Sequence, residues 1–121
     1  MFNVIIIGGE NIPDYEVFQK ECAYYLRDKA KSGERIRILT IGDSYVDKFA
    51  STFGIETQTF HCDWRKHGTS ALAVRNKDMI AEADAIIYFD SNKKDLDNLF
   101  DYVTKAGLPY RRKEISELVN Q

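Results

Sequence analysis

The chain has 121 residues, of which 44% are apolar, and its 19 acidic and 17 basic side chains give a formal net charge of −2. This length is typical of one domain with its own hydrophobic core, so we expect these residues to form a single domain. A sequence pI near 5.7 argues against a nucleic-acid or membrane-surface protein, because the binding faces of such proteins carry a basic excess. The apolar runs are too short to span a bilayer, so we expect a cytoplasmic protein with neither a nucleic acid nor a membrane as partner.

Predicted strands and helices alternate in the first half of the chain. Residues 2–7 form a continuous apolar run rich in β-branched side chains, which indicates a strand buried on both faces. Apolar residues recur at helical spacing over 14–31, and a second strand is predicted over 35–41. A second helix follows over 44–53 and stops at a glycine. Residues 55–60 alternate apolar with polar, which is typical of a strand near a sheet edge.

The second half continues the alternation. A third helix is predicted over 70–83, where Ser70 could act as its cap, and residues 85–89 form another continuous apolar run typical of a central strand. A fourth helical pattern covers 96–106 and ends at a glycine. Residues 108–110 are a weak last strand.

Strands joined by helical crossovers predict a parallel sheet of about five strands with helices on both faces, an α/β three-layer sandwich of the Rossmann-like class. Ranking the strands by apolarity puts the first and the fourth in the middle and predicts the order 3-2-1-4-5. Ligands bind such sheets beyond the carboxyl ends of the strands, where the order reverses. We therefore expect a site between residues 8–14 and 90–94, with 42–47 and 61–75 on the same rim.

Gly8 and Gly9 follow the first predicted strand directly. Glycines at this position let a ligand approach the backbone, and the next helix would offer its N-terminal amides to an anion. The dinucleotide fingerprint GxGxxG is absent, because Glu10 to Pro13 follow. The alternative is a tight strand-to-helix turn without a ligand.

Ser44 and Asp47 stand where the second strand becomes a helix, at the spacing of a capping box. A functional alternative makes them part of a ligand site. Catalysis by Ser44 as a nucleophile would need an adjacent base, which the neighbouring sequence does not supply.

Segment 61–77 is the most informative stretch of the chain. It holds four basic side chains against one acidic one: Arg65, Lys66, Arg75, Lys77 and Asp63. Anionic ligands would be favoured there, and Arg75 can donate two hydrogen bonds to a phosphate or a carboxylate. Asn76 lies on the inward side of its predicted helix, where an amide must find partners. In the alternative interpretation Arg75 pairs with a loop carboxylate such as Asp63, and Asn76 holds the loop.

His61, Cys62, Asp63 and His67 are of types that bind metals or perform thiol chemistry. Adjacent residues rarely point at one ion and no second cluster completes the ligand set, so we predict no metal and no resident cofactor. A Cys62 nucleophile with a histidine base is no better supported. The two cysteines lack the pattern of a disulfide framework, and we expect both to be reduced, with Cys22 in the core.

Together these residues resemble a known family. Gly8-Gly9, Gly42 and Asp47, and above all the motif Asp63-Trp64-x-x-His67-Gly68 followed by Arg75-Asn76-x-x-Met79, are similar to the small YspA-like (DUF2493) members of the SLOG superfamily. The likeness covers about residues 3–111. It implies a Rossmann-like sheet with a pocket for nucleotides or derivatives of the ADP-ribose type. By position, the residues in or beside that pocket would be Gly9, Asp47, Asp63, Trp64, Arg75 and Asn76.

Two segments depart from the family pattern. Segment 42–47 carries bulky side chains where many members have small ones, which narrows the approach of a phosphate. Segment 90–94, Asp-Ser-Asn-Lys-Lys, replaces a glycine-rich loop. In it Lys93 could meet a phosphate as a point charge, whereas Asp90 would oppose one. Enzymes of the superfamily that cleave N-glycosidic bonds use that glycine-rich loop, and its loss argues against this chemistry.

The first functional hypothesis is a binding module that senses or sequesters a phosphorylated nucleotide derivative, ADP-ribose-like or a nucleotide signal. Trp64 would stack on the base, Arg75 would bind phosphate, and Asp47 or Asp63 would accept hydrogen bonds from ribose hydroxyls. For Trp64 the alternative is ordinary packing under a loop.

Two hypotheses from other classes remain open. One is a nucleotide or nucleoside hydrolase, N-glycosidic or phosphoester, in which Asp47 or Asp63 acts as the base. The other is a protein-interaction domain whose pocket has decayed. Adjacent Tyr24 and Tyr25 cannot both face the core, which leaves one aromatic ring for solvent or for a second subunit in a homo-oligomer.

Overall fold

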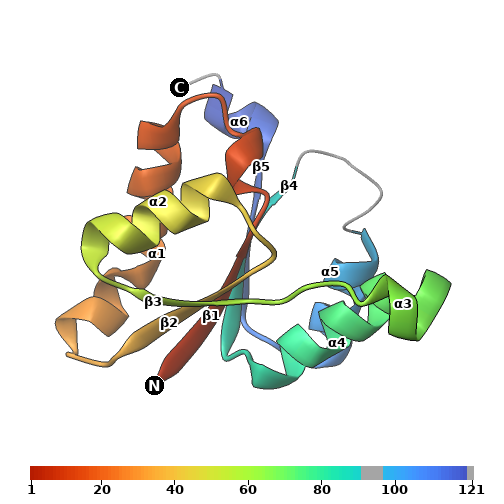
Figure 1. The fold of residues 1–121 in the computed structure, drawn as a ribbon. Coiled ribbons are helices and arrows are strands. Elements are labelled where there is room, and N and C mark those ends of the chain that lie inside the picture. Colours follow the sequence, from red (N-terminus) through yellow and green to blue (C-terminus); the bar gives the residue numbers. More distant parts are fainter. Residues whose placement is uncertain (91–96, 120–121) are drawn as a thin grey trace.

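A five-stranded parallel sheet forms the middle layer of the structure, a computed structural model that describes residues 1–90 and 97–119 (Figure 1). The strands are β1 (Phe2–Ile7), β2 (Ile36–Thr40), β3 (Glu56–Thr59), β4 (Ala85–Asp90) and β5 (Tyr110–Glu114). Their order in the sheet is β3-β2-β1-β4-β5, which confirms the predicted order and the Rossmann-like α/β class.

Helices cover both faces of the sheet. They are η1 (Gly9–Asn11), α1 (Tyr15–Lys31), α2 (Ser44–Phe53), α3 (Trp64–His67), η2 (Gly68–Ser70), α4 (Ala71–Glu82), α5 (Asp97–Lys105) and α6 (Ile115–Val119). The helices α1, α2 and α6 lie on one face, and α4 and α5 lie on the other (Figure 1). None of the helices in the described ranges combines the length and the apolar character that a bilayer crossing needs.

The run of apolar residues in β1 serves both faces of the sheet. Val4 and Ile6 belong to the core under α1 and α2, whereas Ile5 and Ile7 belong to the core under α4 and α5. Successive side chains of a strand point to opposite faces, so a strand covered on both sides must be apolar throughout. Residue Val4 pairs with one residue on each neighbouring strand, which fixes β1 at the centre.

An aromatic cluster fixes α1 and α2 against the sheet. The ring of Phe18 lies 5.5 Å from that of Phe89, 5.6 Å from that of Tyr45 and 6.0 Å from that of Phe49. Such pairs add to the free energy of apolar burial. Cys22, one turn further along α1, is fully buried as predicted, and burial raises the pKa of its thiol, so that it behaves as a small apolar side chain.

The C-terminal part differs from the sequence prediction. The strand predicted at 108–110 is wrong in position, because the chain pairs with β4 over Tyr110–Glu114. This is an edge strand whose side chains are largely exposed, so it needs no apolar run. The short helix α6 was not predicted. The start proposed at 96 for the fourth helix lies outside the described residues, and α5 is described from Asp97.

Candidate functional site

The strand order reverses between β1 and β4. The chain leaves β1 toward α1 on one face and leaves β4 toward α5 on the other, and this is where ligands enter sheets of this class. Gly8 and Gly9 follow β1, and Asp90 ends β4. The residues that follow β2 and β3 lie on the same edge of the sheet.

The two glycines after β1 are required by close packing. Gly8 has φ +84°, and a Cβ there would lie 2.2 Å from the carbonyl oxygen of Phe89 on the neighbouring strand. A Cβ on Gly9 would lie 2.4 Å from the ring of Phe18. The turn leads into η1, so α1 begins only at Tyr15. The interpretation of a tight turn therefore accounts for both glycines, and the amides of α1 do not lie directly after them.

Two carboxylates join the turn after β1 to the start of α2. Asp43 accepts hydrogen bonds from the amide of Tyr45 at 2.9 Å and from that of Val46 at 3.4 Å, and its second oxygen accepts one from the amide of Glu10 at 3.1 Å. In return Glu10 accepts from the amide and from the hydroxyl of Ser44, each at 3.3 Å. We call these two carboxylates with Ser44 the acidic clasp.

The predicted capping box of Ser44 and Asp47 is wrong. The N-cap of α2 is Asp43, and Ser44 is the first residue of the helix. Asp47 lies exposed in the first turn and is not part of the clasp. Similarly, Ser70 stands at the N-cap position of α4, but its side chain makes no capping hydrogen bond.

Asp43 is only 4% exposed, and burial raises the pKa of its carboxyl from the ordinary value of 3.8. The amide hydrogen bonds from Glu10 and Tyr45 lower it, and the nearby carboxylate of Glu10 raises it further. Desolvation has the largest effect, because an ionised group loses most when water is removed.

A small cavity of about 140 Å³ lies against the acidic clasp. Among the described residues its lining is Ile7, Gly8, Glu10, Asn11, Ile41, Gly42 and Asp43. Its charged groups are carboxylates, which accept hydrogen bonds from hydroxyl or amino groups and repel phosphates. Of the residues predicted for the site, Gly8 lines this cavity, and Trp64 and Arg75 do not.

Arg75 and Asn76 form a pair on α4. Asn76 is 3% exposed, as its inward position predicted, and its Oδ1 accepts hydrogen bonds from Nε of Arg75 at 3.2 Å and from Nη2 at 3.1 Å. No carboxylate within the described ranges forms an ion pair with Arg75. The alternative in which Arg75 pairs with Asp63 is therefore wrong, because Asp63 instead caps α3 through the amide of Lys66 at 3.1 Å.

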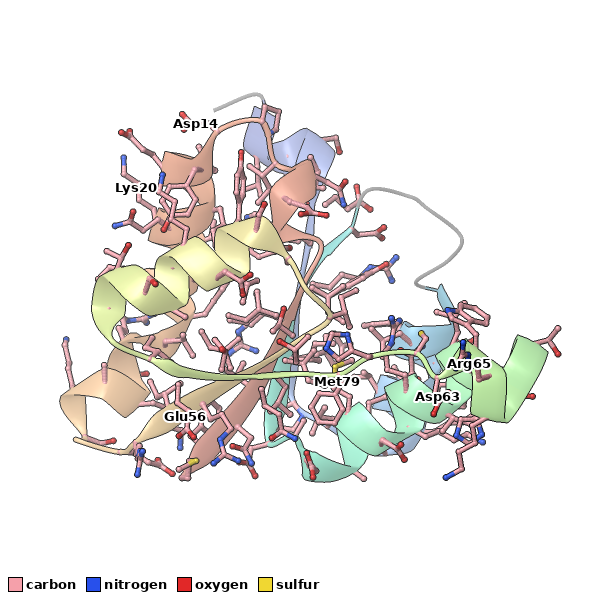
Figure 2. All side chains as sticks on the ribbon, in the orientation of Figure 1. Asp14, Lys20, Glu56, Asp63, Arg65 and Met79 are labelled. Atoms are coloured by element: carbon pink, nitrogen blue, oxygen red, sulfur yellow. The ribbon has the colours of Figure 1, made fainter. Side chains whose placement is uncertain are left out.

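Helix α3 carries the exposed part of the predicted site. Figure 2 shows Asp63 directly before this helix and Arg65 on it, at the opposite side of the view from Asp14. The side chain of Trp64 is 56% exposed and makes no ring contact or hydrogen bond with any described residue. Ordinary core packing of Trp64 is thus excluded. Neighbouring Arg65 and Lys66 are exposed as well.

The carboxylate at the end of β4 has a cationic partner that sequence reasoning missed. Asp90 is 2% exposed and accepts a hydrogen bond from Nε of Arg112 at 3.0 Å, with a second contact from Nη2. The guanidinium also lies 4.7 Å from the ring centre of Phe100. Pairing with Arg112 offsets the repulsion that Asp90 was expected to exert on a phosphate.

The remaining candidates are placed as follows. Lys93 lies outside the described residues. His61, Cys62 and His67 form no group with neighbouring acids that could hold a metal ion, as far as the described ranges extend. No protein-family model, curated protein or solved structure matches this chain, so the resemblance to the YspA-like proteins stays a prediction.

Proposed function

We propose that this protein binds a phosphorylated nucleotide derivative, ADP-ribose-like or a nucleotide signal, at the carboxyl edge of its sheet and acts as a sensor or sequestering module. The observation that carries the proposal is the Arg75–Asn76 pair. A buried amide oxygen holds the guanidinium in place, and no described carboxylate neutralises it. A fixed, uncompensated arginine is suited to an anion with several oxygens.

The hydrogen bonds from Arg75 to Asn76 position the guanidinium before a ligand arrives, which favours binding. An arginine side chain loses about 2 kcal/mol of rotamer entropy when it is ordered. Because Asn76 has already restricted the guanidinium, less of that entropy is lost when a phosphate arrives. The nearby positive charge of Arg65 and Lys66 would attract the same anion from a distance.

The acidic clasp supports a distinct role for the other end of the ligand. Its carboxylates already occupy the amides at the start of α2, which would otherwise attract a phosphate. Glu10 and Asp43 instead present acceptors toward a small cavity, and an acid after the second strand is where sheets of this class bind ribose hydroxyls. We therefore assign the sugar to the clasp, the phosphate to Arg75 and a stacking surface to Trp64.

These placements favour binding over hydrolysis. Neither Asp47 nor Asp63, the two bases of the alternative hydrolase, lines the cavity, and Asp63 is engaged as the cap of α3. A general base must reach the proton that it removes.

Titration calorimetry with ADP-ribose, NAD, AMP and a cyclic nucleotide tests the proposal, with adenosine as the ligand that lacks phosphate. Arg75→Gln should weaken binding of the phosphorylated ligand roughly 10- to 100-fold, because a hydrogen bond to a charged group contributes about 1.5–3 kcal/mol. Lys77→Gln, an exposed cation on the same helix, is the matched control and should change affinity by less than about twofold.

Failure of every phosphorylated ligand to bind at millimolar concentration would contradict the proposal. Equal losses in the Arg75 and Lys77 variants would contradict the assignment of phosphate to Arg75. The chain contains a single tryptophan, so quenching of its fluorescence during the same titrations tests the role of Trp64 separately.

A further inference from the structure

The amino edge of the sheet, opposite the proposed ligand site, carries two hollows of about 550 and 460 Å³. The first lies where β1, β4 and β5 begin, and the second lies where β2 and β3 begin. Leu26 and Glu34 line both, so the hollows flank the C-terminal half of α1 and form one continuous surface. We call it the amino-edge surface. Figure 2 shows Glu56, at the start of β3, on this side of the molecule.

Large apolar side chains are concentrated on the amino-edge surface. Six are exposed in the described part of the chain, and three of them, Met1, Phe53 and Tyr110, line the two hollows. A fourth, Tyr24, is 57% exposed, and its ring lies 5.6 Å from that of Tyr25, which lines the first hollow. Large exposed apolar side chains on one side of a molecule are typical of protein interfaces, where tyrosine contributes strongly.

The charges around these hollows carry both signs. Two of the basic side chains are matched within the chain, since Lys29 lies 3.3 Å from Glu34 and Arg35 lies 3.3 Å from Glu56. In the lining of the first hollow, Asp28 of α1 and Arg111 of β5 form no ion pair with any described residue. Asp84, which also lines this hollow, forms none either, but it accepts a hydrogen bond from the amide of Asn3 at 2.8 Å. The lining of the first hollow thus carries unmatched charges of both signs.

This pattern suits contact with an identical surface. In a two-fold symmetric dimer the same patch meets itself, so a residue i that contacts j is matched by j contacting i. A patch with an excess of one sign, such as segment 61–77 with its four basic side chains and one acidic one, would repel its copy. A patch that carries unmatched charges of both signs can attract its copy twice, because each Asp28 can meet the other chain's Arg111.

We propose that the amino-edge surface joins two copies of this chain in a symmetric dimer, with Tyr24 and Tyr110 packed in the contact and Asp28 paired with Arg111 of the second copy. The dimer leaves the carboxyl edge open. The proposed dimer therefore does not depend on ligand binding at Arg75, and the two proposals can be tested separately.

Sedimentation equilibrium between about 1 and 500 µM, a range typical of weak to moderate association, tests the dimer. Asp28→Arg and Arg111→Asp should each raise the dimer dissociation constant at least about tenfold, because like charges then face each other twice. The double variant carrying both changes restores opposite charges and should return the constant to within about threefold of the unsubstituted protein. Leu72→Glu, at an exposed apolar residue away from these hollows, is the control and should leave it unchanged.

Circular dichroism establishes that each variant is folded. Monomeric behaviour of the unsubstituted protein throughout the range would overturn the proposal. So would a dimer that neither single charge reversal weakens, or single reversals whose losses the double variant does not restore, because either result would place the contact on another face.

Discussion

The buried polar side chains of the described residues gather toward one edge of the sheet. Thr40, Asp43 and Asp90 lie at or just after strand ends, and Asn76 lies on α4. Thr40 accepts hydrogen bonds from the amides of Gly42 and Asp43. Asp43 forms part of the acidic clasp, Asn76 accepts hydrogen bonds from Arg75, and Asp90 accepts one from Arg112. Buried polar groups without partners cost several kcal/mol, so these networks fix the loops of the candidate site.

Asp43 makes the stability of the protein depend on pH. Because its pKa is raised in the folded state, the folded protein holds the proton more tightly than the unfolded chain does. The free energy of unfolding contributed by this group therefore falls as pH rises through the interval between the ordinary value of 3.8 and the higher folded value. Urea unfolding followed by circular dichroism, in steps upward from about pH 4, measures this slope.

The difference between the unsubstituted protein and Asp43→Asn isolates the contribution of Asp43, because asparagine does not titrate. Asp78→Asn, an exposed acid on α4, is the control and should keep the slope of the unsubstituted protein. Parallel profiles for the unsubstituted protein and Asp43→Asn would contradict the assignment.

Single residues show how far sequence reasoning reaches. The inward position of Asn76 follows from helical periodicity, and its burial confirms it. The acidic clasp could not be predicted, because it joins Glu10 to Asp43 and Ser44 across distant parts of the sequence. The spacing of Ser44 and Asp47 indicates a capping box, although Asp43, another favoured capping residue, stands directly before Ser44 and is the N-cap.

At the scale of elements, periodicity predicted the long helices well and the C-terminal part poorly. The strands and the two long helices of residues 2–53 follow from apolar runs, helical spacing and the glycine after residue 53, which match the observed boundaries closely, whereas η1 was not predicted. β5 has the sequence Tyr-Arg-Arg-Lys-Glu, in which no apolar pattern marks a strand. It forms because the backbone of β4 offers an open row of hydrogen-bonding groups, a property that lies in the partner strand.

Helix α6 contributes to stability despite its shortness. Leu118 is 3% exposed and belongs to the core shared with α1 and α2. Leu118→Ala should lower the free energy of unfolding by about 2–5 kcal/mol, the usual cost of truncating a buried leucine. Leu72→Ala, at a leucine that is 41% exposed, is the matched control and should cost less than about 1 kcal/mol. Equal small losses in urea unfolding would show that α6 does not pack on the core.

At the scale of the whole molecule, burial of the strands sets the order in which the sheet opens. β1 and β4 lie inside the sheet and are buried along most of their length, whereas β3 and β5 are edge strands with exposed side chains. Hydrogen exchange followed by mass spectrometry should therefore find the slowest amides in β1 and β4 and faster exchange in β3 and β5. Exchange in β3 as slow as in β1 would contradict this order.

The global architecture was the most predictable property, because strand order depends on apolarity that can be ranked along the chain. The candidate site was only partly predictable. Its location at the carboxyl edge of the sheet follows from the strand order. The pairing of Arg112 with Asp90 and of Arg75 with Asn76 could not be predicted, because it depends on side-chain directions in the folded chain.

The exposure of Trp64 also determines what the intrinsic fluorescence of this protein can measure. Its indole is the sole one in the chain and is 56% exposed in the native state. Water already surrounds much of the ring, so its emission wavelength should shift little on denaturation, and a fluorescence melt would miss the loss of the core. The same exposure leaves the ring accessible to a quencher or to a stacked ligand. The fluorescence of Trp64 should therefore report ligand binding well and unfolding poorly.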